Sequence, residues 1–125
     1  MSFSQDDLTK FKGLYIETSR KYLEDMLQAV AKIKQGEKTE ELVHSVLIAA
    51  HSLAGQSQVA GYKQIAGLSS QIQQVCIEKE EQHLNLDENV LQIENAAKRM
   101  LESVEAIEKG GEELDLSEEI KSLQF

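Results

Sequence analysis

The sequence contains no proline and no tryptophan, and only 5% of its residues are aromatic. Its hydrophobic residues make up 41% of the chain and are mainly Leu, Ile, Val and Ala. This composition favours an all-helical protein over a β-sandwich. No apolar run reaches the roughly 18 residues of a membrane-spanning helix, and the N-terminal residues MSFSQDDLTK lack the apolar segment of a signal peptide. We therefore expect no contact with a membrane.

Positive charge and cysteine are also scarce. Lys and Arg number 13 against 22 Asp and Glu, which gives a formal net charge of -9. Such a charge repels a nucleic-acid backbone and an anionic membrane surface, so neither is an expected partner. Cys76 is the only cysteine and lies in an apolar stretch, where we interpret it as a small buried side chain. A chain that cannot form an internal disulfide is typical of a reducing compartment, and we expect a cytoplasmic location.

The short motifs of common enzyme classes are absent. The sequence has no nucleophile elbow, no glycine loop of the phosphate-binding type and no carboxylate pair at catalytic spacing. His44 and His51 are seven residues apart, about 10 Å along a helix, which is too far for both to bind one metal ion. Zinc-like spacing is missing too, and His83 lies among glutamates in a predicted turn, where solvation is the expected state. We predict no independent catalytic site, no metal and no cofactor of the chain's own.

Four segments with helical periodicity are separated by turn signals, and 125 residues are enough for one domain with one core. The segments cover about residues 4–36, 40–61, 62–80 and 90–110. They predict an all-α, antiparallel up-and-down four-helix bundle over residues 1–111. Residues 112–125 alternate acidic and apolar positions, and they fit either a short C-terminal fifth helix or a linker.

The ends and faces of the first two helices can be predicted from local signals. Ser4 is the expected N-cap of the first helix, Gly36 its end, and Thr39 the expected N-cap of the second. The apolar stripe of the first helix is Leu8, Phe11, Leu14/Tyr15, Tyr22, Met26, Val30 and Ile33. In the C-terminal segment the apolar positions are Leu114, Leu116, Ile120, Leu123 and Phe125.

His51 lies in the second helix, opposite the expected core stripe when residues are placed at 100° per position. That stripe consists of Leu42, Val46, Ala49, Leu53 and Ala60. The histidine should therefore face solvent. The same side of the helix carries His44 and Gln58 about two turns from His51. One turn away it carries Leu47, Ile48, Ala54 and Gly55.

This histidine face is unusual for an exposed helix because it has almost no charge. Gly55 costs the helix about 1 kcal/mol relative to alanine, which makes sense if another molecule must approach the ring closely. We interpret the six residues around His51 as a docking surface for a partner. Leu47 and Ile48 have a second interpretation, as core residues of a rotated or covered helix.

The segment Ala50-His51-Ser52-Leu53-Ala54-Gly55-Gln56-Ser57, followed by Gly61-Tyr62, resembles the phosphoacceptor helix of histidine phosphotransfer (HPt) domains. In particular, it is similar to the N-terminal phosphoacceptor domain of chemotaxis-type histidine kinases. The resemblance extends over most of the chain, because residues 22–26 and 68–72 stand where that family has its first and third helices. It implies a four-helix bundle in which His51 accepts a phosphoryl group.

Two positions depart from the family pattern. Ala54 stands where the family usually has a lysine beside the phosphoryl oxygens, so a charge-assisted contact is missing. Gln73 stands where chemotaxis members have a glutamate that orients the phosphoacceptor ring. A glutamine carbonyl can still accept a hydrogen bond from Nδ1 of His51 and leave Nε2 free, but it adds no negative charge. We expect these departures to affect the rate of phosphorylation at His51 more than its possibility.

The resemblance implies a phosphocarrier that works with two kinds of partner, a response-regulator receiver domain and the catalytic domain of a histidine kinase. The partner would supply Mg²⁺. As an isolated domain the chain is expected to be monomeric. Two alternatives stay open: a degenerate HPt fold that binds a receiver or kinase without carrying phosphate, and a structural helical bundle in which the histidine has no role.

Overall fold

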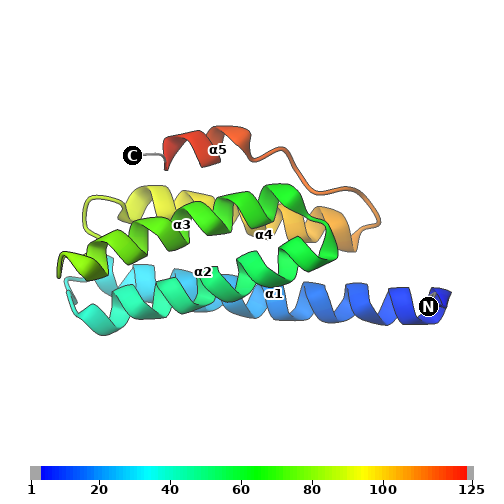
Figure 1. The fold of residues 1–125 in the computed structure, drawn as a ribbon, viewed down its shortest axis with the longest axis horizontal. Coiled ribbons are helices and arrows are strands. Elements are labelled where there is room, and N and C mark those ends of the chain that lie inside the picture. Colours follow the sequence, from blue (N-terminus) through cyan, green and yellow to red (C-terminus); the bar gives the residue numbers. More distant parts are fainter. Residues whose placement is uncertain (1–3, 124–125) are drawn as a thin grey trace.

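The computed structural model describes residues 4–123, which form an antiparallel bundle of four long α-helices followed by a short one (Figure 1). The described residues contain no β-strand. The prediction of an all-α four-helix bundle is therefore confirmed, and so is the short-helix alternative for the C-terminal segment. The helices are α1 (Gln5–Lys34), α2 (Glu40–Ala60), α3 (Lys63–Glu81), α4 (Val90–Glu108) and α5 (Ser117–Ser122).

The predicted helix caps are present. The Ser4 hydroxyl accepts a hydrogen bond from the Asp7 amide at 3.1 Å, and the Asp7 carboxylate accepts one from the Ser4 amide, which forms a capping box. Thr39 caps α2 by accepting from the Leu42 amide. Gly61 ends α2 with a φ of +86°, a left-handed conformation that favours glycine. Local sequence signals thus set the limits of α2, the helix that carries His51.

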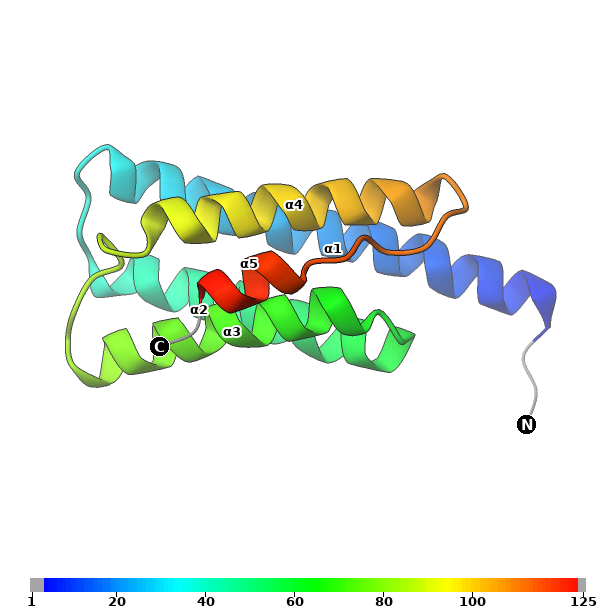
Figure 2. The same ribbon diagram turned by 90° about the horizontal axis from the view of Figure 1, so that it is seen from above.

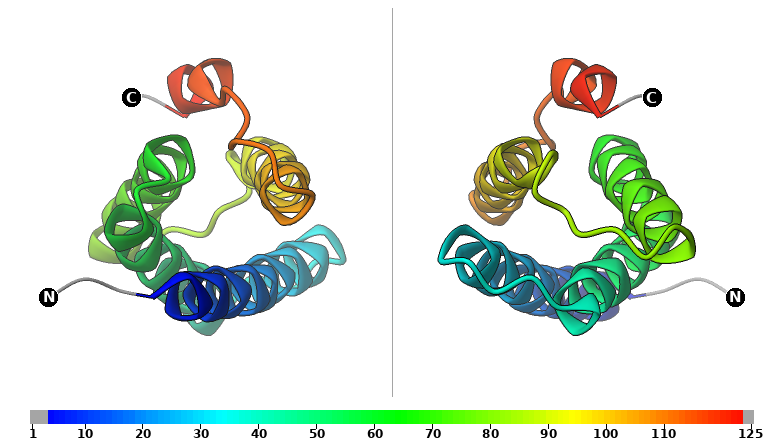
Figure 3. Two further views of the ribbon diagram at one scale, coloured as in Figure 1. Left: turned by 90° about the vertical axis from the view of Figure 1, so that its right-hand side faces the viewer. Right: turned by 90° about the vertical axis from the view of Figure 1, so that its left-hand side faces the viewer.

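The order of the helices around the bundle is α3, α2, α1, α4, with neighbours packed against each other (Figure 3). Contacts between α3 and α4 are sparse, and α5 lies over both of these helices (Figure 2). The fifth helix therefore closes the side of the bundle on which the four long helices pack least. No helix within residues 4–123 has the length and apolarity to cross a membrane.

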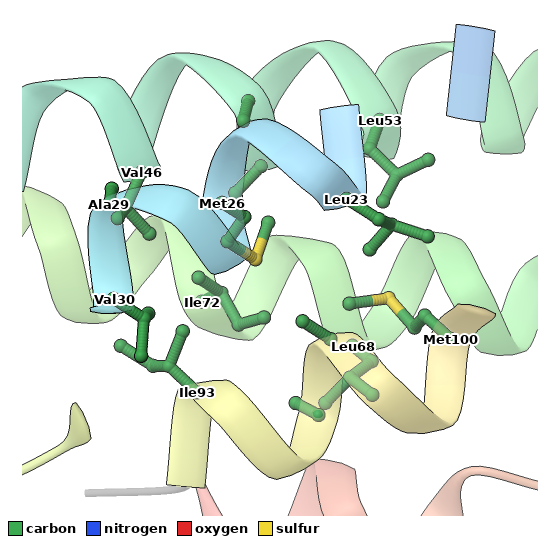
Figure 4. Close-up of a cluster of buried hydrophobic side chains, with 14 of the residues drawn as sticks. Leu23, Met26, Ala29, Val30, Val46, Leu53, Leu68, Ile72, Ile93 and Met100 are labelled. Carbon is green, nitrogen blue, oxygen red and sulfur yellow. The ribbon is translucent and has the colours of Figure 1, made fainter. Parts of the chain in front are cut away.

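Apolar side chains from all four long helices meet in one buried cluster (Figure 4). The largest fully buried residues include Leu23, Met26, Leu53, Leu68, Ile72, Ile93 and Met100. Cys76 is also fully buried, as interpreted from the sequence. Burial, together with the nearby Glu80 charge, raises the pKa of the Cys76 thiol to about 12, so the thiol stays protonated and unreactive at neutral pH.

The predicted core stripe of α1 is wrong over its first turns. Leu8, Phe11 and Leu14 are about half exposed, whereas Tyr15 is buried. The reason is length: the 30 residues of α1 span about 45 Å, and the 21 residues of α2 about 32 Å. The first turns of α1 therefore extend past the end of the bundle (Figure 1). Phe11 and Leu14 are exposed for another reason, because they line an open hollow beside the end of α2.

The segment between α4 and α5 is attached to the bundle by hydrogen bonds to α3. Tyr62 at the start of α3 provides no side-chain cap, and the Glu113 carboxylate accepts from the Gln64 and Ile65 amides instead, both at 3.1 Å. In return, the Gln64 side chain accepts from the Leu116 amide. Leu116 is fully buried. Residues 112–123 thus pack on the bundle; Phe125, the last position of the expected apolar pattern, lies outside the described residues.

The burial of Leu53 and the exposure of His51 predict opposite sensitivities to substitution. Leu53→Ala should lower the free energy of unfolding by about 2–5 kcal/mol because it leaves a cavity in the core. His51→Gln should be nearly neutral because an exposed ring loses few contacts. Denaturant unfolding of the two variants measures both effects. A larger loss for His51→Gln would mean that the faces of α2 are assigned wrongly.

Glu113 caps α3 from a distant segment, and its removal should be measurable. Glu113→Ala should lower the free energy of unfolding by about 1 kcal/mol, the usual effect of losing an N-cap acceptor. Glu112→Ala is the matched control, because Glu112 is exposed and its loss changes the net charge equally. The control should change stability by less than about 0.5 kcal/mol. Equal losses in the two variants would argue against the cap.

Candidate functional site

His51 is exposed near the middle of α2, as predicted. His44 and Gln58 are exposed as well, while the opposite face of the helix is buried. The predicted core residues Leu42, Val46, Ala49 and Leu53 are all buried, and Ala60 is partly buried. The geometry therefore presents the imidazole to a second molecule.

The two sides of His51 differ in exposure, and this corrects the prediction that Ala54 belongs to the docking surface. Ala54 is only 9% exposed, and Leu47 packs against the core, so neither offers much docking surface. Val43 and Ala50 are buried too. The physical reason is that α2 has two neighbours, α1 and α3, so its buried face is wider than a stripe opposite His51. His51 consequently lies at the edge of the exposed face, next to α3.

Gln73 of α3 contacts the ring, as expected from the family resemblance. Its Nε2 lies 3.1 Å from Nδ1 of His51. In this orientation the amide donates, Nδ1 accepts, and the ring proton is on Nε2, which is the reverse of the predicted direction. A half-turn of the amide places its oxygen at Nδ1 and frees Nε2 for attack. An amide therefore holds the ring in place but accommodates either tautomer.

The other flank of His51 is open. Gly55 is exposed, and a Cβ built on it would meet no atom within 4 Å. Beside it is a hollow of about 280 Å³ whose wall includes the half-exposed Phe11 and Leu14 of α1 and the exposed Val59. Ile48, one turn before His51, is 49% exposed. Of the predicted docking residues, Gly55, Ile48, Gln58 and His44 are accessible.

A polar network that the sequence analysis missed fixes α2 against α1 beside this flank. Gln56 accepts from the Thr18 hydroxyl and donates to the Ser19 hydroxyl, both at 2.8 Å. The Tyr15 hydroxyl and the buried Ser57 hydroxyl are 2.8 Å apart, and burial raises the pKa of the Tyr15 phenol. The signal in the sequence was two serines, Ser19 in α1 and Ser57 in α2, which stand among apolar residues on the buried faces of these helices. The network orients the turn of α2 that contains Gly55.

His44 and His83 each contact a carboxylate. Nδ1 of His44 lies 2.7 Å from Oε1 of Glu80, and Nδ1 of His83 lies 3.0 Å from Oε1 of Glu40. His83 is well exposed, as predicted. Within residues 4–123, no three His, Cys, Asp or Glu side chains are grouped so that they could hold a metal ion.

Comparison with known protein families agrees with this geometry. A model of the Hpt domain family matches residues 10–117, which include most of α1, all of α2 to α4 and the first residue of α5. A comparison with curated protein sequences found no match.

The tautomer of His51 should respond to the residue at position 73. Gln73→Glu replaces an amide with a carboxylate, which can only accept, so it should hold the proton on Nδ1 and free Nε2. Long-range ¹H–¹⁵N NMR of the imidazole distinguishes the two tautomers. Gln74→Glu, at the exposed neighbouring position, is the control with the same change of charge. If both variants shift the tautomer equally, the contact with Gln73 does not set it.

Proposed function

The chain belongs to the Hpt domain family, the histidine phosphotransfer domains of phosphorelay signalling, and on this premise we propose that His51 carries the phosphoryl group. The observation that supports this role best is an exposed imidazole in the middle of α2 whose Nδ1 is in contact with a side chain of α3. Hydrogen bonding at Nδ1 directs Nε2 toward an incoming group. The open flank at Gly55 gives a large partner access to it.

In the proposed reaction, the lone pair of Nε2 attacks the phosphorus of an aspartyl phosphate or of ATP. A bond forms between Nε2 and phosphorus, and the bond to the leaving carboxylate or to ADP breaks. The step requires the half-turned amide, in which the proton on Nδ1 is hydrogen-bonded to the Gln73 oxygen. The reverse step passes the group to a receiver aspartate. The chain is thus a carrier, and the likeness to chemotaxis-type kinases supports a kinase catalytic domain as one phosphodonor.

The partner supplies the charge stabilisation that the transfer needs. Phosphoryl transfer requires cations around the phosphoryl oxygens, and Mg²⁺ bound to the kinase or receiver would provide them. Ala54 contributes no ammonium group and is nearly buried. The exposed face of α2 around His51 therefore provides a nucleophile and a surface of low charge density for docking.

Two observations favour a second function, docking to a receiver or kinase without carrying phosphate. The Gln73 amide directs its NH₂ group at Nδ1, the orientation that places the proton on the attacking nitrogen. Ala54 also lacks the ammonium group expected beside the phosphoryl oxygens. In this alternative the same face binds the partner, and His51 is only a contact residue.

Transfer from a phosphorylated receiver domain separates the two functions. The parent chain should gain one phosphoryl group from the receiver in intact-mass analysis, and the modification should be acid-labile and alkali-stable, as phosphohistidine is. His51→Gln should gain none from the same donor. Gly55→Ala should stabilise α2 by up to about 1 kcal/mol and yet slow the transfer, because the methyl group hinders the partner. Gly55→Arg should block transfer without unfolding the chain.

Gly13→Arg is the matched control, because Gly13 is also an exposed helical glycine with open space around its Cβ position. It should leave transfer unchanged. Binding of the receiver without transfer would support the docking function. Equal transfer rates for Gly55→Arg and the parent would mean that the partner docks elsewhere.

A further inference from the structure

A second histidine shares the geometry of His51. His44 lies two helical turns before His51 on α2, and Glu80 lies two turns after Gln73 on α3. Because the two helices are antiparallel, each histidine faces a polar residue of α3 at the same relative position. Nδ1 of His44 lies 2.7 Å from the Glu80 carboxylate, and its side chain is 59% exposed.

The Glu80 carboxylate beside His44 is a stronger hydrogen-bond acceptor than the Gln73 amide beside His51. A carboxylate can only accept a hydrogen bond, so Glu80 keeps the proton on Nδ1 and leaves Nε2 as the free nitrogen. The Gln73 amide accommodates either tautomer. Of the two rings, His44 is therefore the one whose tautomer is fixed for attack through Nε2.

The space beside His44 suits a small phosphodonor. A cavity of about 430 Å³ between α1 and α2 is lined by His44, Ser45 and Ile48 from α2 and by Gln28 and Lys32 from α1, among others. The Lys32 ammonium can pair with phosphoryl oxygens. Asp25 is the one acidic residue in the wall and has the opposite effect.

Access for a protein partner is worse at His44 than at His51. The position one turn after His51 is Gly55, whereas the position one turn after His44 is Ile48, whose side chain is half exposed. A branched side chain there hinders the close approach of a folded domain. The Ile48 side chain still leaves room for a small molecule that enters the cavity from solvent.

We propose that His44 is a second phosphoacceptor, loaded by a small acyl phosphate or phosphoramidate. The lone pair of Nε2 forms a bond with phosphorus, and the bond from phosphorus to the acyl oxygen breaks, with its electron pair leaving on the carboxylate. With phosphoramidate, the P–N bond breaks and ammonia leaves. The ring becomes a phospho-imidazolium, and its Nδ1 proton stays on the hydrogen bond to Glu80. This role goes beyond the transfer through His51 and does not require it.

The sequence allows a clean test, because it contains three histidines, His44, His51 and His83. All three are exposed, so full-length chains that keep one histidine, with Gln at the other two positions, should fold, which circular dichroism and thermal melts verify. Each chain, and one with no histidine, is incubated with acetyl phosphate and, separately, with phosphoramidate. Intact mass gives the rate of loading, and NMR of the phosphorylated ring identifies the modified nitrogen.

The chain that keeps only His44 should gain one phosphoryl group on Nε2 from at least one donor. Glu80→Gln in that chain should slow the loading by roughly tenfold, the change expected when a charge-assisted hydrogen bond is lost, and should yield some product on Nδ1. Lys32→Gln should slow it as well without changing the modified nitrogen. These two readouts distinguish positioning of the ring from charge pairing with the donor.

Loading of the His44 chain no faster than of the histidine-free chain would overturn the proposal. So would loading on Nδ1, or a rate that Glu80→Gln leaves unchanged. Transfer from a phosphorylated receiver to the chain that keeps only His51 is measured alongside. Failure of that transfer with normal loading of His44 would count against the carrier role of His51 alone, and the converse result would count against the second acceptor alone.

Discussion

The antiparallel packing of α2 against α3 is the constraint on which the site depends. It places Gln73 at Nδ1 of His51 and Glu80 at Nδ1 of His44. A histidine on an isolated helix has no fixed tautomer and no fixed ring orientation, because both are set by the hydrogen bond at the other nitrogen. The residue that contacts Nδ1 of each ring lies far along the chain, 22 residues after His51 and 36 residues after His44.

The rest of the bundle keeps this pairing in place. The network of Gln56, Thr18 and Ser19 fixes the rotation of α2 against α1. At the same end of the bundle, Glu113 caps α3 from the segment before α5. Because α3 and α4 pack sparsely, the docking of this segment helps to hold α3 where its polar residues meet the two rings.

Local signals in the sequence predicted most of the helices and the exposure of His51, because caps, turns and periodicity act over a few residues. Ala54, Leu8 and Glu113 show what such signals do not contain. The burial of Ala54 depends on how α2 is rotated between two neighbours, and the exposure of Leu8 on how far α1 extends past the others. Glu113 caps a helix that begins about 50 residues earlier, a separation of 49 residues from Gln64. The pairing of His44 with Glu80 likewise depends on the register between α2 and α3, which no local signal contains.

We infer that the residue on α3 decides how readily each histidine of α2 accepts a phosphoryl group. The most direct test of this inference is an exchange of the two α3 residues in one chain, Gln73→Glu with Glu80→Gln, which leaves composition and net charge unchanged. The measurement is the ratio of phosphate on His51 to phosphate on His44 after loading with phosphoramidate, determined by peptide mapping. The exchange should raise this ratio severalfold relative to the parent chain. A ratio equal to that of the parent would contradict the inference.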